Sequence, residues 1–158
     1  MLKKTPSRRG FIGRVAAAGA ATQLHAQPAG RVSGFDHVAL PMQNTDAMLA
    51  FYRGLGFDVI ENAVACSVYI GENMINFHRP ATWQRESFTL RAPAAKPPCG
   101  DLCFVWEGTA AALKAMLNRA GAKPIEGPVV RQGGRKKGAS SVYVRDPDGN
   151  LLEFMIYS

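Results

Sequence analysis

The sequence predicts an α+β fold in which two similar βαβββ modules pair, so that their sheets form a cup. The chain has 158 residues, of which 47% are hydrophobic and 20% are charged. This composition indicates one globular domain rather than a fibrous or disordered protein. Apolar and polar residues alternate in most segments, and apolar residues recur at helical spacing in only two. The order of these segments repeats along the chain, and a repeated unit of this kind must pair to bury its apolar side chains.

The first module spans about residues 35–79. It opens with a strand at 35–41, which a proline ends. Polar residues at 44–46 offer a helix N-cap, and apolar residues then recur at helical spacing until Gly54 and Gly56 close the helix. Three short strands are expected next, at 57–64, 66–70 and 74–79.

The second module spans about residues 101–158 and follows a proline-rich connection at 80–100. A strand is expected at 101–106, and Thr109 caps a helix that ends at Gly121. Three strands are expected to follow, at 124–131, 140–145 and 151–157, the last two joined by a strong turn signal at 146–150.

The N-terminal residues 1–26 have the layout of a removable export signal, a basic head followed by small apolar residues. Within them, Ser7–Ile12 resembles the twin-arginine export motif, which implies a periplasmic protein. We expect cleavage after Ala26 and a linker at 27–34. The apolar stretch at 15–21 is too short to span a bilayer, so no stable membrane insertion is expected.

The net charge of +7 does not indicate a nucleic-acid-binding protein. Five basic residues lie in the first 26 positions, which contain no Asp or Glu, and the remainder carries 14 positive against 12 negative charges. A nucleic-acid-binding domain would carry a basic stripe outside any targeting segment. The three cysteines form an odd set, which argues against a disulfide framework.

Four residues are candidate ligands for a divalent metal such as Fe, Mn, Ni, Zn or Co. His37 and His78 lie on the first and last strands of module one, while Asp101 and Glu153 lie on the equivalent strands of module two. A carboxylate in a strand as apolar as that around Glu153 is costly unless it is paired, hydrogen-bonded or bound to a metal. Imidazoles with carboxylates suit such metals, although each histidine could equally be a structural one.

Three further residues are candidate substrate-binding residues. Asn76 shares a strand face with His78, and Cys103 shares one with Asp101. Arg131 begins a basic loop at 131–138 that could clamp an anionic substrate. The alternatives are core packing for Cys103 and a solvated hairpin for the loop.

Three segments, Phe35–Leu40, Phe51–Phe57 and Val144–Glu153, closely resemble the vicinal oxygen chelate superfamily. This superfamily includes glyoxalase I, extradiol dioxygenases, and fosfomycin-resistance and bleomycin-binding proteins. Shorter segments resemble its glyoxalase domain-containing branch, namely Met74–His78, Gly100–Phe104 and Glu126–Val129.

The resemblance implies paired βαβββ modules, a homodimer, and a metal held by residues of the first and last strands. His37 and Glu153 match those ligand positions. Asp101 stands where metal-dependent members usually have His, and Asn76 stands where glyoxalase I has Glu. The second difference removes a ready proton shuttle and argues against glyoxalase I activity.

We therefore expect an exported, metal-dependent enzyme, a lyase, isomerase or dioxygenase, that acts on a small oxygenated molecule. The molecule would chelate the metal, which acts as a Lewis acid. The alternative is a metal-free protein of the bleomycin-resistance type that binds or sequesters a small ligand in the same cup. The replacement of the usual His by Asp101 keeps this alternative open.

Overall fold

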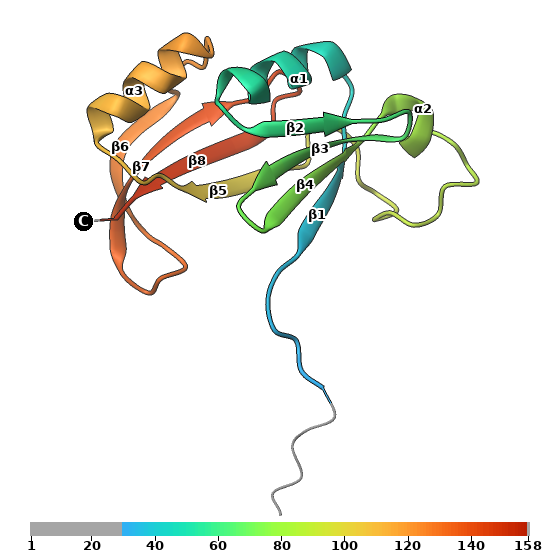
Figure 1. The fold of residues 1–158 in the computed structure, drawn as a ribbon, viewed down its shortest axis with the longest axis horizontal. Helices are drawn as coiled ribbons and strands as arrows, with labels where there is room; N and C mark the ends of the chain where they lie inside the picture. Colours follow the sequence, from blue (N-terminus) through green and yellow to red (C-terminus); the bar gives the residue numbers. More distant parts are fainter. Residues whose placement is uncertain (1–29, 158) are drawn as a thin grey trace, which may run out of the picture. The chain divides into compact units, whose positions relative to one another are not determined.

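The computed structural model describes residues 30–157 (Figure 1). The helices and strands of these described residues lie in one compact unit, Gly34–Ser158. Residues 30–33 precede this unit; they are exposed and form no regular secondary structure. The predicted export signal at 1–26 lies outside the described residues. No helix in the described part of the chain is long and apolar enough to cross a membrane.

The predicted order of strands and helices is confirmed, and the two modules have the same sheet topology. The strand orders are β1-β4-β3-β2 and β5-β8-β7-β6, with one parallel pair in each sheet, β1 with β4 and β5 with β8. Module one consists of β1 (His37–Pro41), α1 (Thr45–Gly54), β2 (Asp58–Glu61), β3 (Ala65–Ile70) and β4 (Asn73–His78). Module two consists of β5 (Asp101–Val105), α3 (Ala110–Arg119), β6 (Glu126–Gln132), β7 (Gly138–Arg145) and β8 (Leu151–Ile156). The connection, expected as a loop, contains the short helix α2 (Pro80–Trp83).

The two long helices are capped in different ways. The Thr109 side chain accepts a hydrogen bond of 3.1 Å from the backbone N–H of Ala112, as predicted for the start of α3. The Asn44 side chain makes no cap hydrogen bond with α1. Instead, the carboxylate of Asp148 accepts the backbone N–H groups of Gln43 and Asn44, at 2.6 and 2.8 Å. A carboxylate from module two therefore stabilises the N-terminus of α1, where negative charge is favoured.

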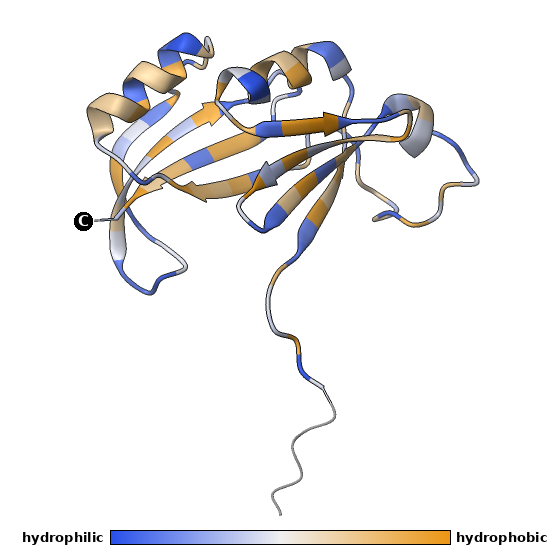
Figure 2. Ribbon diagram, in the orientation of Figure 1, coloured by the Kyte–Doolittle hydropathy of each residue, from blue (hydrophilic) through white to orange (hydrophobic). Residues whose placement is uncertain are grey.

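Helices α1 and α3 lie side by side over the two sheets (Figure 1), and they share one hydrophobic core. The rings of Phe57 and Phe104, one from each module, are 5.3 Å apart in this core. Along the strands, orange and blue residues alternate (Figure 2), so each sheet has one apolar face under its helix. We call the opposite face of each sheet, which carries no helix, the open face.

The turn between β7 and β8 joins the modules through buried polar groups. Asn150 is 1% exposed, and its Oδ1 accepts the backbone N–H groups of Cys99 and Gly100, at 3.0 and 2.8 Å. Asp146 accepts hydrogen bonds from the Tyr52 hydroxyl, at 3.1 Å, and from the Asn150 amide, at 2.8 Å. Burial raises the pKa of both Tyr52 and Asp146. The turn thus fixes the start of β5 and the middle of α1 at once.

Candidate functional site

The predicted site residues of module one lie on the open face of its sheet. His37 and Asn76 belong to the neighbouring strands β1 and β4, and His78 lies two residues beyond Asn76. The Asn76 amide lies 3.4 Å from Nε2 of His78 and accepts a hydrogen bond of 3.2 Å from Ser67. The His78 ring meets Phe88 of the connection edge to face at 4.9 Å. The pKa of His78 is lowered, first by partial burial and then by the charge of His37.

Asp36 sets the orientation of the His37 ring, although the alternation of side chains along a strand would place these two neighbours on opposite faces. Oδ1 of Asp36 lies 2.6 Å from Nδ1 of His37. Asp36 precedes β1, so the alternation of side chains along a strand does not apply to it. Among the described residues, nothing else hydrogen-bonds the His37 ring, whose side chain is 46% exposed. Its Nε2 is therefore available to a ligand.

The predicted residues of module two lie on the open face of the second sheet. Glu153 of β8 is the register partner of Cys103 on β5 and of Tyr143 on β7. The Tyr143 hydroxyl donates a 3.0 Å hydrogen bond to Oε1 of Glu153. Asp101 lies two residues before Cys103 on the same strand face. Tyr143 was not predicted as a site residue, because the register of β7 against β8 is not visible in the sequence.

Arg131 lies near this group at the edge of the same sheet. Its guanidinium donates a 2.7 Å hydrogen bond to Glu126 and lies 5.8 Å from the centre of the Tyr143 ring. Tyr143 in turn contacts Glu153. Arg131 is therefore connected to Glu153 through one tyrosine.

The four candidate metal ligands are divided between the open faces of two sheets, His37 and His78 on the first and Asp101 and Glu153 on the second. The register partner of His37 is Met74, four residues from His78. We call each of the two pairs a half-site. Among residues 30–157 of one chain, no three His, Cys, Asp or Glu side chains come close enough to hold a metal ion. The donor types still fit a divalent metal, since they are imidazoles and carboxylates. The carboxylate at Nδ1 of His37 is also the arrangement common beside metal-binding histidines.

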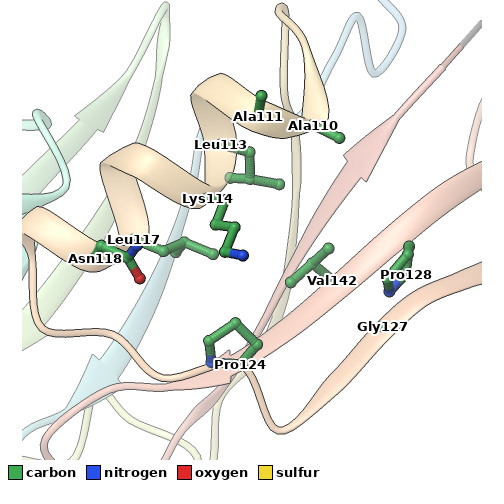
Figure 3. A pocket seen from close by; sticks show the side chains of 10 residues that line it. All are labelled: Ala110, Ala111, Leu113, Lys114, Leu117, Asn118, Pro124, Gly127, Pro128 and Val142. Atoms are coloured by element: carbon green, nitrogen blue, oxygen red, sulfur yellow. The ribbon is translucent and has the colours of Figure 1, made fainter.

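A cavity lies elsewhere, between α3 and the strands β6 and β7 (Figure 3). It has a volume of about 470 Å³ and mostly apolar walls, which include Leu113, Leu117 and Val142, with Lys114 as the charged lining residue. It lies on the helix side of the second sheet, and none of the predicted site residues lines it.

We expect the Cys103 thiol to be unreactive at neutral pH. Its pKa is raised to about 12, first by desolvation, then by the hydrogen bond and the charge of Glu153, both of which favour the protonated form. At pH 8, only about one Cys103 in 10⁴ is then a thiolate. Iodoacetamide labelling read by peptide mass spectrometry should show Cys99 reacting first, with the rate at Cys103 rising about tenfold per pH unit.

The substitution Glu153→Gln removes the carboxylate charge and is expected to speed the labelling of Cys103 at pH 8. The matched control Glu72→Gln changes an exposed turn residue and should leave the rate unchanged. Equal labelling of Cys99 and Cys103 in the unmodified chain would contradict the raised pKa.

Comparisons with known proteins identify the family. Residues 34–154 match the family model described as the Glyoxalase/Bleomycin resistance protein/Dioxygenase superfamily. A glyoxalase domain-containing protein of Mycosarcoma maydis is 32% identical over 127 residues, which cover 80% of this chain and 69% of that protein. A virulence protein of Salmonella typhimurium is 32% identical over 130 residues, which cover 80% of this chain and 85% of that protein.

Two solved structures have a similar fold. The crystal structure of the Salmonella typhimurium virulence protein has a TM-score of 0.71 at 29% identity and covers 82% of this chain and 100% of that one. An integron cassette protein from Vibrio cholerae has a TM-score of 0.71 at 28% identity and covers 82% and 98%. The matching segment, the paired modules and these relatives show that the chain belongs to the glyoxalase/bleomycin resistance protein/dioxygenase superfamily.

Proposed function

We propose that this protein is a metal-dependent enzyme whose site is completed by two copies of the chain. The observation that carries the proposal is the division of the ligand-type side chains into two half-sites, each on an open face. His37, with His78, would come from one protomer. Glu153, with Asp101, would come from the open face of its partner's second sheet. Neither half alone supplies the three protein ligands that a catalytic metal commonly has.

Exposed apolar side chains on the open faces support a homodimer. Ile60 and Tyr69 on the first sheet are 55% and 38% exposed, and Val105 on the second is 45% exposed. Their strand partners place them on the faces that carry Asn76 and Glu153. Apolar surface of this kind is typical of faces that a partner covers. Association through these faces would bring the half-sites of two chains together in a symmetric pair.

A bound divalent metal would act as a Lewis acid on a small oxygenated substrate that offers two adjacent oxygens. His37 would bind through Nε2, with Asp36 holding the ring orientation and the tautomer. Tyr143 would hold Glu153 in position. Lyase, isomerase and dioxygenase reactions all use such a site. Export to the periplasm, proposed from residues 1–26, would require folding in the cytoplasm before transport.

A second candidate function is metal-free binding of a small ligand, and the hydrogen bonds within each half-site favour it. His37 bonds Asp36, and Tyr143 bonds Glu153. These polar groups are partnered without a metal, as in a binding cup whose polar groups fix a ligand's orientation.

Metal analysis of mixed variants tests the shared site. His37→Ala removes the first half-site and Glu153→Ala the second, so homodimers of either variant should hold no metal. In a mixed dimer, one site combines the two damaged halves and the other combines two intact halves. Unfolding and refolding an equal mixture should therefore restore about one metal per four chains, because about half of the dimers are mixed.

The control is Glu72→Gln, which should keep the full metal content of about one per chain. Elemental analysis after gel filtration reads the metal, and the elution volume reads the dimer. If the unmodified protein binds no metal on titration, the enzyme proposal fails and the metal-free binding protein stands. If metal binds but mixing restores none, the site lies within one chain and sharing between copies is refuted.

A further inference from the structure

The hairpin loop at residues 133–137, which joins β6 to β7, rests on the open face of the second sheet. The loop turns through hydrogen bonds from the backbone N–H of Gly133 to the Lys137 carbonyl, at 3.1 Å, and from that of Lys136 to the Gly133 carbonyl, at 3.0 Å. A side chain at Gly133 would overlap the Tyr157 hydroxyl and the Met155 sulfur. Met155 belongs to the strand face that carries Glu153, and Tyr157 follows directly after the end of β8. The loop is therefore seated on the same face as the proposed metal ligand.

This loop gathers positive charge beside Tyr157. The Arg135 guanidinium lies 4.8 Å and the Lys137 ammonium 5.5 Å from the centre of the Tyr157 ring. Arg131, at the base of the hairpin, pairs with Glu126. In the described part of the chain, Arg135 forms no ion pair with a carboxylate. The loop is hydrophilic along its length (Figure 2), and the charge of Arg135 is available to an anion.

A second, independent observation points to a ligand on this face. Ser141 of β7 is fully buried, and among the described residues its Oγ has no hydrogen-bond partner. Its register partners are Val129 on β6 and Met155 on β8, so it lies one strand from the methionine that the loop contacts. A buried hydroxyl without a partner costs stability. In a native structure, such an unpaired group is a candidate to hydrogen-bond a ligand atom.

We propose that the loop cations, with Ser141 and Tyr157, form a subsite for an oxyanion of the substrate, a carboxylate or a phosphate group. Arg135 and Lys137 supply charge-assisted hydrogen bonds, and the Ser141 hydroxyl donates to the anion. Ser141 is fully buried, so its hydroxyl can reach an anion only if the loop shifts as the anion enters. This inference rests on the proposed function and names the class of its substrate. Met155, the register partner of Ser141, lies two residues from Glu153, and Tyr157 lies four, so the anion would lie about 7–13 Å from Glu153 along the strand.

Anion binding to metal-free protein tests the subsite separately from the metal. Inorganic phosphate and succinate are titrated by calorimetry into protein held in chelator, and the two anions distinguish phosphate from carboxylate recognition. The double substitution Arg135→Gln and Lys137→Gln should weaken binding at least about tenfold. The control Arg85→Gln and Lys123→Gln removes the same charge from exposed positions outside the loop and should leave binding nearly unchanged.

Ser141→Ala provides the sharper test. If the hydroxyl serves an anion, this substitution weakens anion binding without lowering stability to urea, because it removes an unpaired buried group. A merely structural serine would not change anion affinity. The proposal is overturned if the unmodified protein binds neither anion, if the control loses as much affinity as the loop variant, or if Ser141→Ala binds normally. Because no metal is present, each of these outcomes leaves the proposed metal site undecided.

Discussion

Replacing Asn150 with alanine is expected to lower the free energy of unfolding by about 3–5 kcal/mol. The side chain accepts the backbone N–H groups of Cys99 and Gly100 and donates to Asp146. The residue is 1% exposed, so water cannot readily replace these bonds. The substitution leaves two backbone N–H groups without acceptors and removes one hydrogen-bond donor from the buried carboxylate of Asp146. Buried polar groups that lose their partners lower the free energy of unfolding strongly.

Urea unfolding followed by circular dichroism, at matched protein concentration, measures the effect of Asn150→Ala. Asn62→Ala is the control, because Asn62 also accepts two backbone N–H groups, those of Val64 and Ala65. It is exposed and its bonds stay within one turn, so a loss below about 1 kcal/mol is expected. Similar losses in the two variants would show that the burial of Asn150 and the long range of its hydrogen bonds add nothing to stability.

Gly127→Ala is expected to cost about 3 kcal/mol or more. Gly127 has a φ angle of +110°, a backbone conformation that residues other than glycine rarely adopt. A Cβ there would collide with the Ser141 carbonyl oxygen and lie 2.8 Å from the Val142 Cα. Both obstacles are backbone atoms of β7, so no rotamer change relieves the overlap. The pairing of β6 with β7 shifts register between Glu126 and Val129. Glycine is common at such irregularities, because its backbone adopts conformations that other residues avoid.

The same unfolding assay applies to Gly127→Ala, with soluble yield as a second measure in case the variant does not fold. Gly134→Ala is the control, because an added Cβ there meets nothing within 4 Å. It should shift stability by less than about 1 kcal/mol in either direction. A Gly127→Ala variant as stable as the unmodified chain would refute the close approach of β6 to β7.

Much of the fold follows from local patterns. Thr109, the turn at 146–150 and the short apolar run of β8 are short-range signals, and each predicted the observed element. The capping of α1 was only partly predictable, because its carboxylate comes from Asp148, 104 residues away from Asn44. The short helix α2 was missed, since its four residues lie in a proline-rich connection with no helical periodicity.

The candidate site was predictable by residue type and strand face but not by assembly. Alternation grouped His78 with Asn76 on one strand face, since that pattern is local. It could not show that Tyr143 pairs with Glu153, because register between strands depends on the whole sheet. Nor could it show that the half-sites lie apart in one chain. The function of these residues therefore remains a proposal for the mixed-variant experiment.

The cap that Asp148 places on α1 also affects the order in which the chain folds. During synthesis, α1 leaves the ribosome about 100 residues before the carboxylate that accepts the backbone N–H groups of Gln43 and Asn44 at its N-terminus. Contacts so distant in sequence slow folding, because a long loop must close before they form. Module one therefore completes its folding only after nearly the whole chain has been made. A nascent chain that stops before module two leaves its first helix uncapped and its apolar surface open to aggregation.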